Sequence, residues 1–70
     1  MANSTTEILR INIKKYRLER GLTQEKLSEL TNISTDYISE IERGKRVPSI
    51  KRLDLLANAL KIEAYMLLKP

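Results

Sequence analysis

Apolar side chains recur three or four positions apart along most of the 70 residues, which is the period of an amphipathic α-helix. Leu9, Ile13 and Tyr16 mark the inward side of a first helix. Leu27 and Leu30, three residues apart, mark the inward side of a second helix. No stretch alternates between apolar and polar residues for long enough to indicate a β-strand. The pattern therefore predicts an all-α fold.

Capping residues set the limits of the first two helices. The segment "STTE" has the form of a capping box, with Ser4 as N-cap and Glu7 at the third helical position, so the first helix begins after Ser4. It ends at Gly21, because glycine suits the left-handed residue that closes many helices. The second helix begins after Thr23 and lasts about two turns. Asn32 ends it, since asparagine tolerates the left-handed conformation.

Two further helices follow the same rules. Ser34 is the N-cap of a third helix, which ends at Gly44. Proline does not fit a helix interior, so a fourth helix begins only after Pro48, with Ser49 as its cap. The apolar stripe of this fourth helix consists of Ile50, Leu53, Leu56, Ala57 and Leu60.

A fifth short helix is predicted around residues 63–68, with Leu67 as its core residue. Helices this short are marginal alone in water, so tertiary packing must hold all five together. Seventy residues make one domain, residues 1–70, near the lower size limit for independent folding. The expected architecture is a compact five-helix domain.

Composition excludes several classes of function. The chain has no cysteine and no histidine, which excludes disulfides and thiolate zinc sites and removes the side chain most used in acid–base catalysis. No apolar run approaches the roughly 18 residues of a membrane span, and "MANSTTE" lacks the features of a signal peptide. We expect a soluble cytoplasmic protein that is not an enzyme and has no cofactor, metal or evident small-molecule ligand.

Positive charge is concentrated in the segment "RGKRVPSIKR", residues 43–52. It contains five of the 13 basic residues and no acidic residue. The rest of the chain contains eight basic and nine acidic residues, so it has no positive excess. A surface that serves only solubility would intersperse the two signs. The segment therefore favours a polyanionic partner.

The predicted third helix directly precedes this basic segment. Ile38 and Ile41 define its buried direction, and polar groups occupy the opposite side and its edges. An α-helix fits the DNA major groove and reaches base edges with its N-terminal side chains. The candidate base-contacting residues are Thr35, Asp36, Tyr37, Ser39 and Glu40. Tyr37 could instead pack its ring on the domain and offer only its hydroxyl to a phosphate.

Five segments spread over residues 13–68 carry a further pattern: "IKKYR", "GLTQEKLSEL", "NIS", "YISEIERGKRVPS" and "LLANAL". In these segments the chain resembles the Cro and phage-repressor type helix-turn-helix family, also called the Xre family. Small stand-alone regulators, such as restriction–modification controller proteins, are the most similar members. Ser28 and Asn32 stand where the family often has alanine and glycine. Both are small or conformationally tolerant enough to keep the geometry.

The resemblance implies a lambda-repressor-like domain whose second and third helices, about residues 23–44, form the helix-turn-helix. It also implies that Gln24 contacts a DNA phosphate, and that Arg17 and Glu42 form a structural ion pair. The other candidate phosphate-contacting residues are Arg43, Lys45, Arg46, Ser49 and Lys51.

Tyr65, Met66 and Leu68 are apolar residues close to the C-terminus, which predicts a two-fold interface between copies of the chain. The leading hypothesis is a transcriptional regulator that binds an inverted-repeat operator in double-stranded DNA as a homodimer. An alternative is a protein-interaction module, such as an antitoxin or an anti-repressor-like partner. A third is a small hydrolase or nuclease that holds Mg²⁺ between Asp36 and Glu40, for which the sequence supplies no third ligand.

Overall fold

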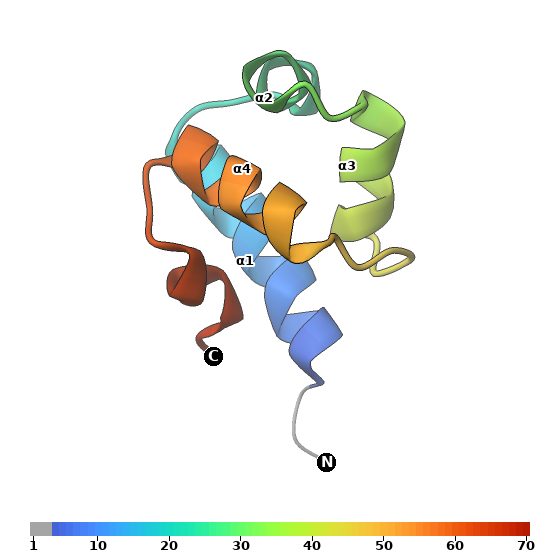
Figure 1. Ribbon diagram of the computed structural model, residues 1–70, viewed down its shortest axis with the longest axis vertical. Coiled ribbons are helices and arrows are strands. Elements are labelled where there is room, and N and C mark those ends of the chain that lie inside the picture. Colours follow the sequence, from blue (N-terminus) through green and yellow to red (C-terminus); the bar gives the residue numbers. More distant parts are fainter. Residues whose placement is uncertain (1–3) are drawn as a thin grey trace.

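The computed structural model describes residues 4–70, so the first three residues of the "MANSTTE" segment lie outside the described residues. The elements in chain order are α1 (Thr5–Glu19), α2 (Gln24–Thr31), α3 (Thr35–Glu42), α4 (Ile50–Leu60) and the 3₁₀ helix η1 (Ala64–Leu68) (Figure 1). Residues 4–70 contain no strand, which confirms the all-α prediction. The fifth element is a 3₁₀ helix, whereas the sequence predicted only a short helix of unspecified type.

Each α-helix begins at a hydroxyl side chain that accepts a hydrogen bond from the backbone three residues later. The distances from the backbone nitrogen to the hydroxyl oxygen are 3.1 Å for Glu7 to Ser4 and 3.0 Å for Lys26 to Thr23. They are 3.1 Å for Tyr37 to Ser34 and 3.2 Å for Arg52 to Ser49. The predicted capping box is only half formed. The carboxylate of Glu7 does not return to the N-cap but pairs with Arg10 one turn further on. A charged partner on the same helix face offers a stronger hydrogen bond than a backbone amide.

Left-handed residues close the helices. Gly21, Asn32 and Gly44 have φ values of 69°, 59° and 75°, as their sequence positions predicted. Beyond α3, the Gly44 N–H donates to the carbonyl of Ile41 at 3.0 Å, and the next N–H donates to Glu40 at 2.8 Å. This pair of bonds satisfies carbonyls that the helix leaves free. Lys61 also has a positive φ, 60°, at the end of α4, where its sequence gave no such indication.

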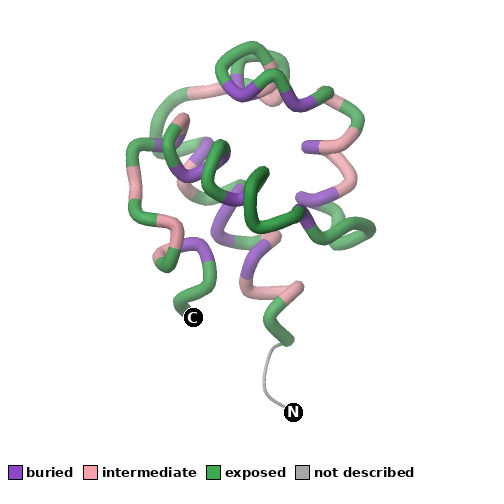
Figure 2. Tube along the Cα trace, viewed as in Figure 1, coloured by how far each residue is buried: buried purple, intermediate pink, exposed green. Residues whose placement is uncertain are grey.

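All five described elements contribute to the core: α1 packs against α3, α4 and η1, α2 packs against α3 and α4, and η1 also packs against α4 (Figures 1 and 2). The fully buried large side chains of the core are Ile13, Leu27, Ile38, Ile41, Leu56, Leu60 and Leu67. None of the helices within residues 4–70 is both long enough and apolar enough to cross a bilayer.

Two residues predicted to face inward do not. Leu30 is 53% exposed, because the buried direction of α2 runs through Leu27 and Thr31, one turn apart. Ile50 is 76% exposed, although it belongs to the apolar stripe of α4. It is the first residue of its helix, and helical side chains lean toward the N-terminus, so Ile50 extends beyond the part of α4 that covers the core.

A buried asparagine fastens the C-terminal segment to α1. The side-chain amide of Asn12, whose residue is 8% exposed, donates to the carbonyls of Leu67 at 3.0 Å and Lys69 at 2.8 Å, and more weakly to Met66 at 3.3 Å. These bonds satisfy backbone acceptors that a short 3₁₀ helix cannot pair internally. Asn12 therefore fixes η1 in place, a role that the apolar spacing of α1 did not predict.

Candidate nucleic-acid interface

A short turn joins α2 to α3 and fixes the direction of α3. Asn32 takes the left-handed conformation, Ile33 is buried, and Ser34 caps α3. The hydroxyl of Ser28 donates to the carbonyl of Ile33, while the hydroxyl of Thr31 accepts from the Ile33 N–H at 3.2 Å. Both polar groups of the buried Ile33 backbone are thus paired, so the turn has little freedom to move.

The polar side of α3 is not covered by the other residues of the described range, 4–70. Ile38 and Ile41 are buried at 0% and 1% exposure, as predicted. Asp36 is exposed, whereas Thr35 and Ser39 are partly exposed. Helix α3 therefore presents short polar side chains on the side opposite its apolar anchor.

The other two candidate base-contacting residues, Tyr37 and Glu40, are partly exposed and already have partners within the chain. The Glu40 carboxylate accepts from Nε of Arg46 at 2.7 Å. The guanidinium carbons of Arg46 and Arg52 lie 4.9 and 4.6 Å from the centre of the Tyr37 ring, which packs against the core. The hydrogen bond from Arg46 to Glu40 is the main cause that raises the pKa of Arg46 above its ordinary value.

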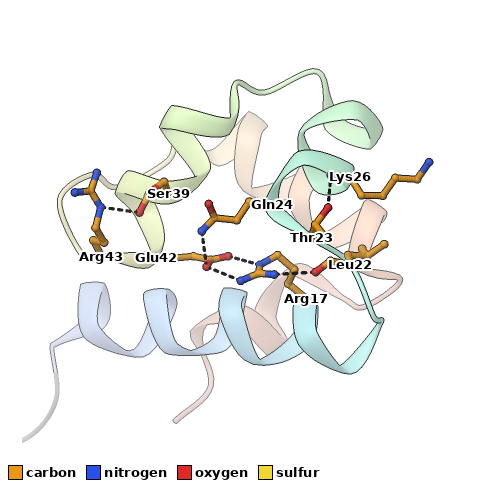
Figure 3. A network of polar contacts seen from close by, with 8 residues as sticks. All are labelled: Arg17, Leu22, Thr23, Gln24, Lys26, Ser39, Glu42 and Arg43. Atoms are coloured by element: carbon orange, nitrogen blue, oxygen red, sulfur yellow. Dashed lines mark hydrogen bonds and ion pairs between the residues drawn. The ribbon is translucent and has the colours of Figure 1, made fainter.

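Behind α3, the predicted structural pair is present as a buried bidentate ion pair (Figure 3). Arg17 on α1 donates to both oxygens of Glu42, at 2.7 and 3.0 Å, and to the carbonyl of Leu22 at 2.8 Å. The hydrogen bond to Glu42 raises the pKa of Arg17, against the opposing effect of burial. Arg17 and Glu42 are 8% and 7% exposed, so this network ties α1 to the end of α3 inside the domain.

Gln24, the first residue of α2, joins the same network. Its side-chain nitrogen donates to Glu42 at 3.0 Å (Figure 3). An amide nitrogen carries two hydrogens, so this bond orients the side chain and leaves a second donor. Gln24 is partly exposed and therefore still accessible to an anion.

The loop after α3 and the start of α4 hold a run of exposed cations. The exposed candidate phosphate-contacting residues are Arg43, Lys45, Arg46, Ser49 and Lys51. Arg43 also donates through Nε to the carbonyl of Ser39 at 3.4 Å, near the C-terminal end of α3 (Figure 3). Lys45 and Lys51 form no ion pair with any carboxylate in the described part of the chain, residues 4–70. Their charges are therefore available to an external anion.

Comparison with known proteins identifies the family. The sequence model of the family described as "Helix-turn-helix" matches residues 13–67. The chain belongs to the helix-turn-helix family.

Among relatives of this helix-turn-helix protein, the uncharacterised HTH-type transcriptional regulator y4dJ of Sinorhizobium fredii is 39% identical over 59 residues, which cover 84% of this chain and 77% of that one. Control protein C.SmaI of Serratia marcescens is 37% identical over 62 residues, covering 89% and 74% of the two chains. The structure is similar to that of the restriction–modification controller protein C.Esp1396I, solved as a tetramer in complex with its natural 35 base-pair operator. That similarity has a TM-score of 0.84 at 36% identity and covers 94% and 87% of the two chains.

Two basic residues near the interface of this helix-turn-helix protein were not assigned from its sequence. Arg52 contributed only to the count of charges in residues 43–52, and its position over Tyr37 depends on how α4 approaches α3. Arg10 lies beneath the loop that follows α3. Its Cδ would be 3.1 Å from a Cβ added at Gly44. Neither contact has a local sequence signal, because both join segments that are distant along the chain.

The three residues predicted to form a two-fold interface lie in η1, near the end of the described residues. Tyr65 and Leu68 are 66% and 41% exposed, and Met66 is partly exposed. Leu67 between them is fully buried, as predicted for a core residue. Leu67 therefore packs in the core, while Tyr65 and Leu68 lie at the surface and Met66 lies partly at the surface.

The pair of carboxylates considered for Mg²⁺ is not isolated. Glu40 is paired with Arg46, while Asp36 is exposed one turn earlier on α3. Residues 4–70 contain no group of three or more histidine, cysteine, aspartate or glutamate side chains that could hold a metal ion. Glu40 thus already serves as the partner of a cation.

Proposed function

We propose that this chain is a transcriptional regulator that binds a specific sequence in double-stranded DNA, and that residues 23–44 form its helix-turn-helix within a single domain. The observation that carries the proposal is the uncovered polar side of α3 beside a run of exposed cations. A helix of this kind fits the major groove, while the cations neutralise phosphates on its borders. A related controller protein has been solved on its operator, which supports the same role for this chain.

The residues divide into two sets by chemistry. The proposed base-contacting set is Thr35, Asp36, Tyr37, Ser39 and Glu40, and the proposed phosphate-contacting set is Gln24, Arg43, Lys45, Arg46, Ser49 and Lys51. Asp36 is free to accept a hydrogen bond from the cytosine amino group. Glu40 would accept the same kind of hydrogen bond from a cytosine while its ion pair with Arg46 stays in place. Tyr37 contributes its hydroxyl, since its ring is engaged with two arginines.

We further propose that the chain acts as a homodimer through Tyr65, Met66 and Leu68. Exposed apolar side chains at the end of a small domain favour association, because the domain buries little surface alone. A two-fold dimer presents two copies of α3, which must lie about 34 Å apart to enter successive major grooves. The matching operator is an inverted repeat.

Selection of bound sequences from a pool of random duplexes tests the proposal. We expect enrichment of an inverted repeat whose half-sites are about one helical turn apart. Affinity for the selected duplex should then fall with salt, with a slope of log affinity against log salt of roughly −5 to −9 for a dimer.

Two variants separate the residue sets. Asp36→Asn should change which bases are enriched, because it removes the carboxylate acceptor. Lys45→Gln should weaken binding to all duplexes alike and flatten the salt slope. A pool without enrichment, together with a monomeric protein, would contradict the proposal. It would favour a protein-interaction module whose partner covers Tyr65 and Leu68.

A further inference from the structure

Tyr37 holds two guanidinium groups at the border of the proposed DNA-binding surface. Its ring packs against the core and is only partly exposed, so its position is fixed by the fold. The guanidinium carbons of Arg46 and Arg52 lie 4.9 and 4.6 Å from the ring centre. Planar guanidinium groups stack well on aromatic faces, whose negative quadrupole attracts them. One aromatic side chain of α3 thus orients one cation from the following loop and one from α4.

The two arginines differ in how their charge is balanced. Arg46 has the Glu40 carboxylate at 2.7 Å, which neutralises much of its charge. Arg52 forms no ion pair with any carboxylate of residues 4–70 and is exposed. A guanidinium whose face stacks on a ring keeps the N–H groups along its edge free to donate, since stacking uses the face and not the edge of the cation.

The surroundings of Arg52 fit an anion with several oxygen atoms. A surface groove of about 590 Å³ lies between the α2–α3 turn and the start of α4. Its lining includes Arg52 together with Lys51 and the hydroxyl-bearing Ser49. Two cations and a hydroxyl group along one groove provide several donors and no carboxylate. A phosphodiester of the DNA backbone is the polyanion that the proposed function brings to this surface.

We propose that Arg52 is a phosphate-contacting residue of the DNA interface, and that Tyr37 is the positioning residue that holds the guanidinium groups of Arg46 and Arg52 in place. This inference rests on the proposed DNA-binding function and adds a residue to it. It also changes the part played by Tyr37, whose ring acts through the two arginines and not by reading bases.

The test measures binding of full-length variants to the duplex recovered by selection and to a scrambled duplex of the same composition. Arg52→Gln should weaken binding of a dimer roughly thirtyfold at about 0.15 M salt and flatten the salt slope by about 1.8, because each protomer loses one phosphate contact. Both duplexes should be affected equally, since a phosphate contact carries no sequence information. Lys14→Gln, the same loss of charge at an exposed position of α1, is the matched control and should change binding far less.

Variants of Tyr37 separate the ring from the hydroxyl. Tyr37→Phe keeps the aromatic face and loses only the contact of the hydroxyl. It should therefore weaken DNA binding less than Tyr37→Leu, which keeps apolar packing but removes the ring that positions the two arginines. In an Arg52→Gln background, Tyr37→Leu should have a smaller effect than in the wild type, because one of the two groups that it positions is absent. Thermal unfolding of each variant verifies that the fold is retained.

The outcomes are distinct. Normal binding by Arg52→Gln, alongside a wild type that binds DNA, would overturn the role of Arg52 and leave the proposed function intact. Equal losses in Tyr37→Phe and Tyr37→Leu would overturn the positioning role, because the hydroxyl would then be the active group. A wild type that binds neither duplex would overturn the proposed function and this inference together.

Discussion

Arg17 on α1 holds both carboxylate oxygens of Glu42 on α3, through Nε at 2.7 Å and Nη2 at 3.0 Å. Both residues are more than nine-tenths buried. The pair joins the first helix of the chain to the helix that carries the proposed base contacts. Removal of the pair should therefore lower the stability of the domain and also disturb the position of α3.

Glu42→Ala should lower the free energy of unfolding by about 3–5 kcal/mol, because it leaves the Arg17 guanidinium buried without a counter-charge. That is a large share of the stability of a small domain. Urea denaturation followed by circular dichroism measures the change. Glu29→Ala, which breaks the exposed pair of Glu29 with Lys26, should have little effect. Equal losses in the two variants would show that burial of the Arg17–Glu42 pair is unimportant.

Gly44 and Gly21 offer a matched comparison of backbone and packing effects. Both have positive φ, 75° and 69°, so alanine at either position should cost about 1–2 kcal/mol of stability. A Cβ at Gly21 meets no atom within 4 Å, whereas one at Gly44 would lie 3.1 Å from Cδ of Arg10. Gly44→Ala should therefore be the more destabilising in thermal unfolding. Adding Arg10→Ala should remove the difference if the contact is its cause.

Asn12→Ala should loosen the C-terminal segment more than it disturbs the core. The substitution leaves the carbonyls of Leu67 and Lys69 without their donor, at a cost of about 1–3 kcal/mol. Hydrogen exchange should become faster in η1, and sedimentation should show weaker self-association. Asn58→Ala, at an exposed position of α4, is the control and should leave both measurements unchanged. Unaltered association of the Asn12 variant would argue against an interface built on η1.

Lys51→Glu should separate stability from binding. Helix α4 has no acidic residue in its first turn, unlike α1, α2 and α3. A carboxylate at this position interacts favourably with the helix dipole, so stability should rise by about 0.3–1 kcal/mol. DNA affinity should fall, because a cation proposed to contact phosphate has become an anion. Lys51→Gln should lie between the two in both thermal unfolding and titration with duplex DNA.

The features that local chemistry controls could be predicted from the sequence. Each α-helix begins at the hydroxyl residue expected to cap it, and Gly21, Asn32 and Gly44 take the left-handed conformation. These features depend on residues within one turn of one another, which the sequence displays directly.

Features that depend on the approach of distant segments could not be predicted from local pattern; the Arg17–Glu42 pair was expected only from the resemblance to a known family. Leu30 and Ile50 fit the helical period, but the positions of the neighbouring helices leave them exposed. The bond between Glu40 and Arg46 requires the path of the loop after α3, and the position of Arg52 over Tyr37 requires the packing of α4. The partners of Arg46 and Arg52 are therefore the part of the proposed interface that the sequence did not predict.

Helix α3 has only eight residues, and a peptide of that length has almost no helical content by itself in water. The groups proposed to read DNA thus acquire their arrangement only when Ile38 and Ile41 are seated in the core. The proposed DNA-reading surface and the core of the domain therefore form together, in one cooperative folding step. Weakening the apolar core away from α3 should reduce the number of competent molecules in a sample, while each molecule that remains folded keeps its full affinity.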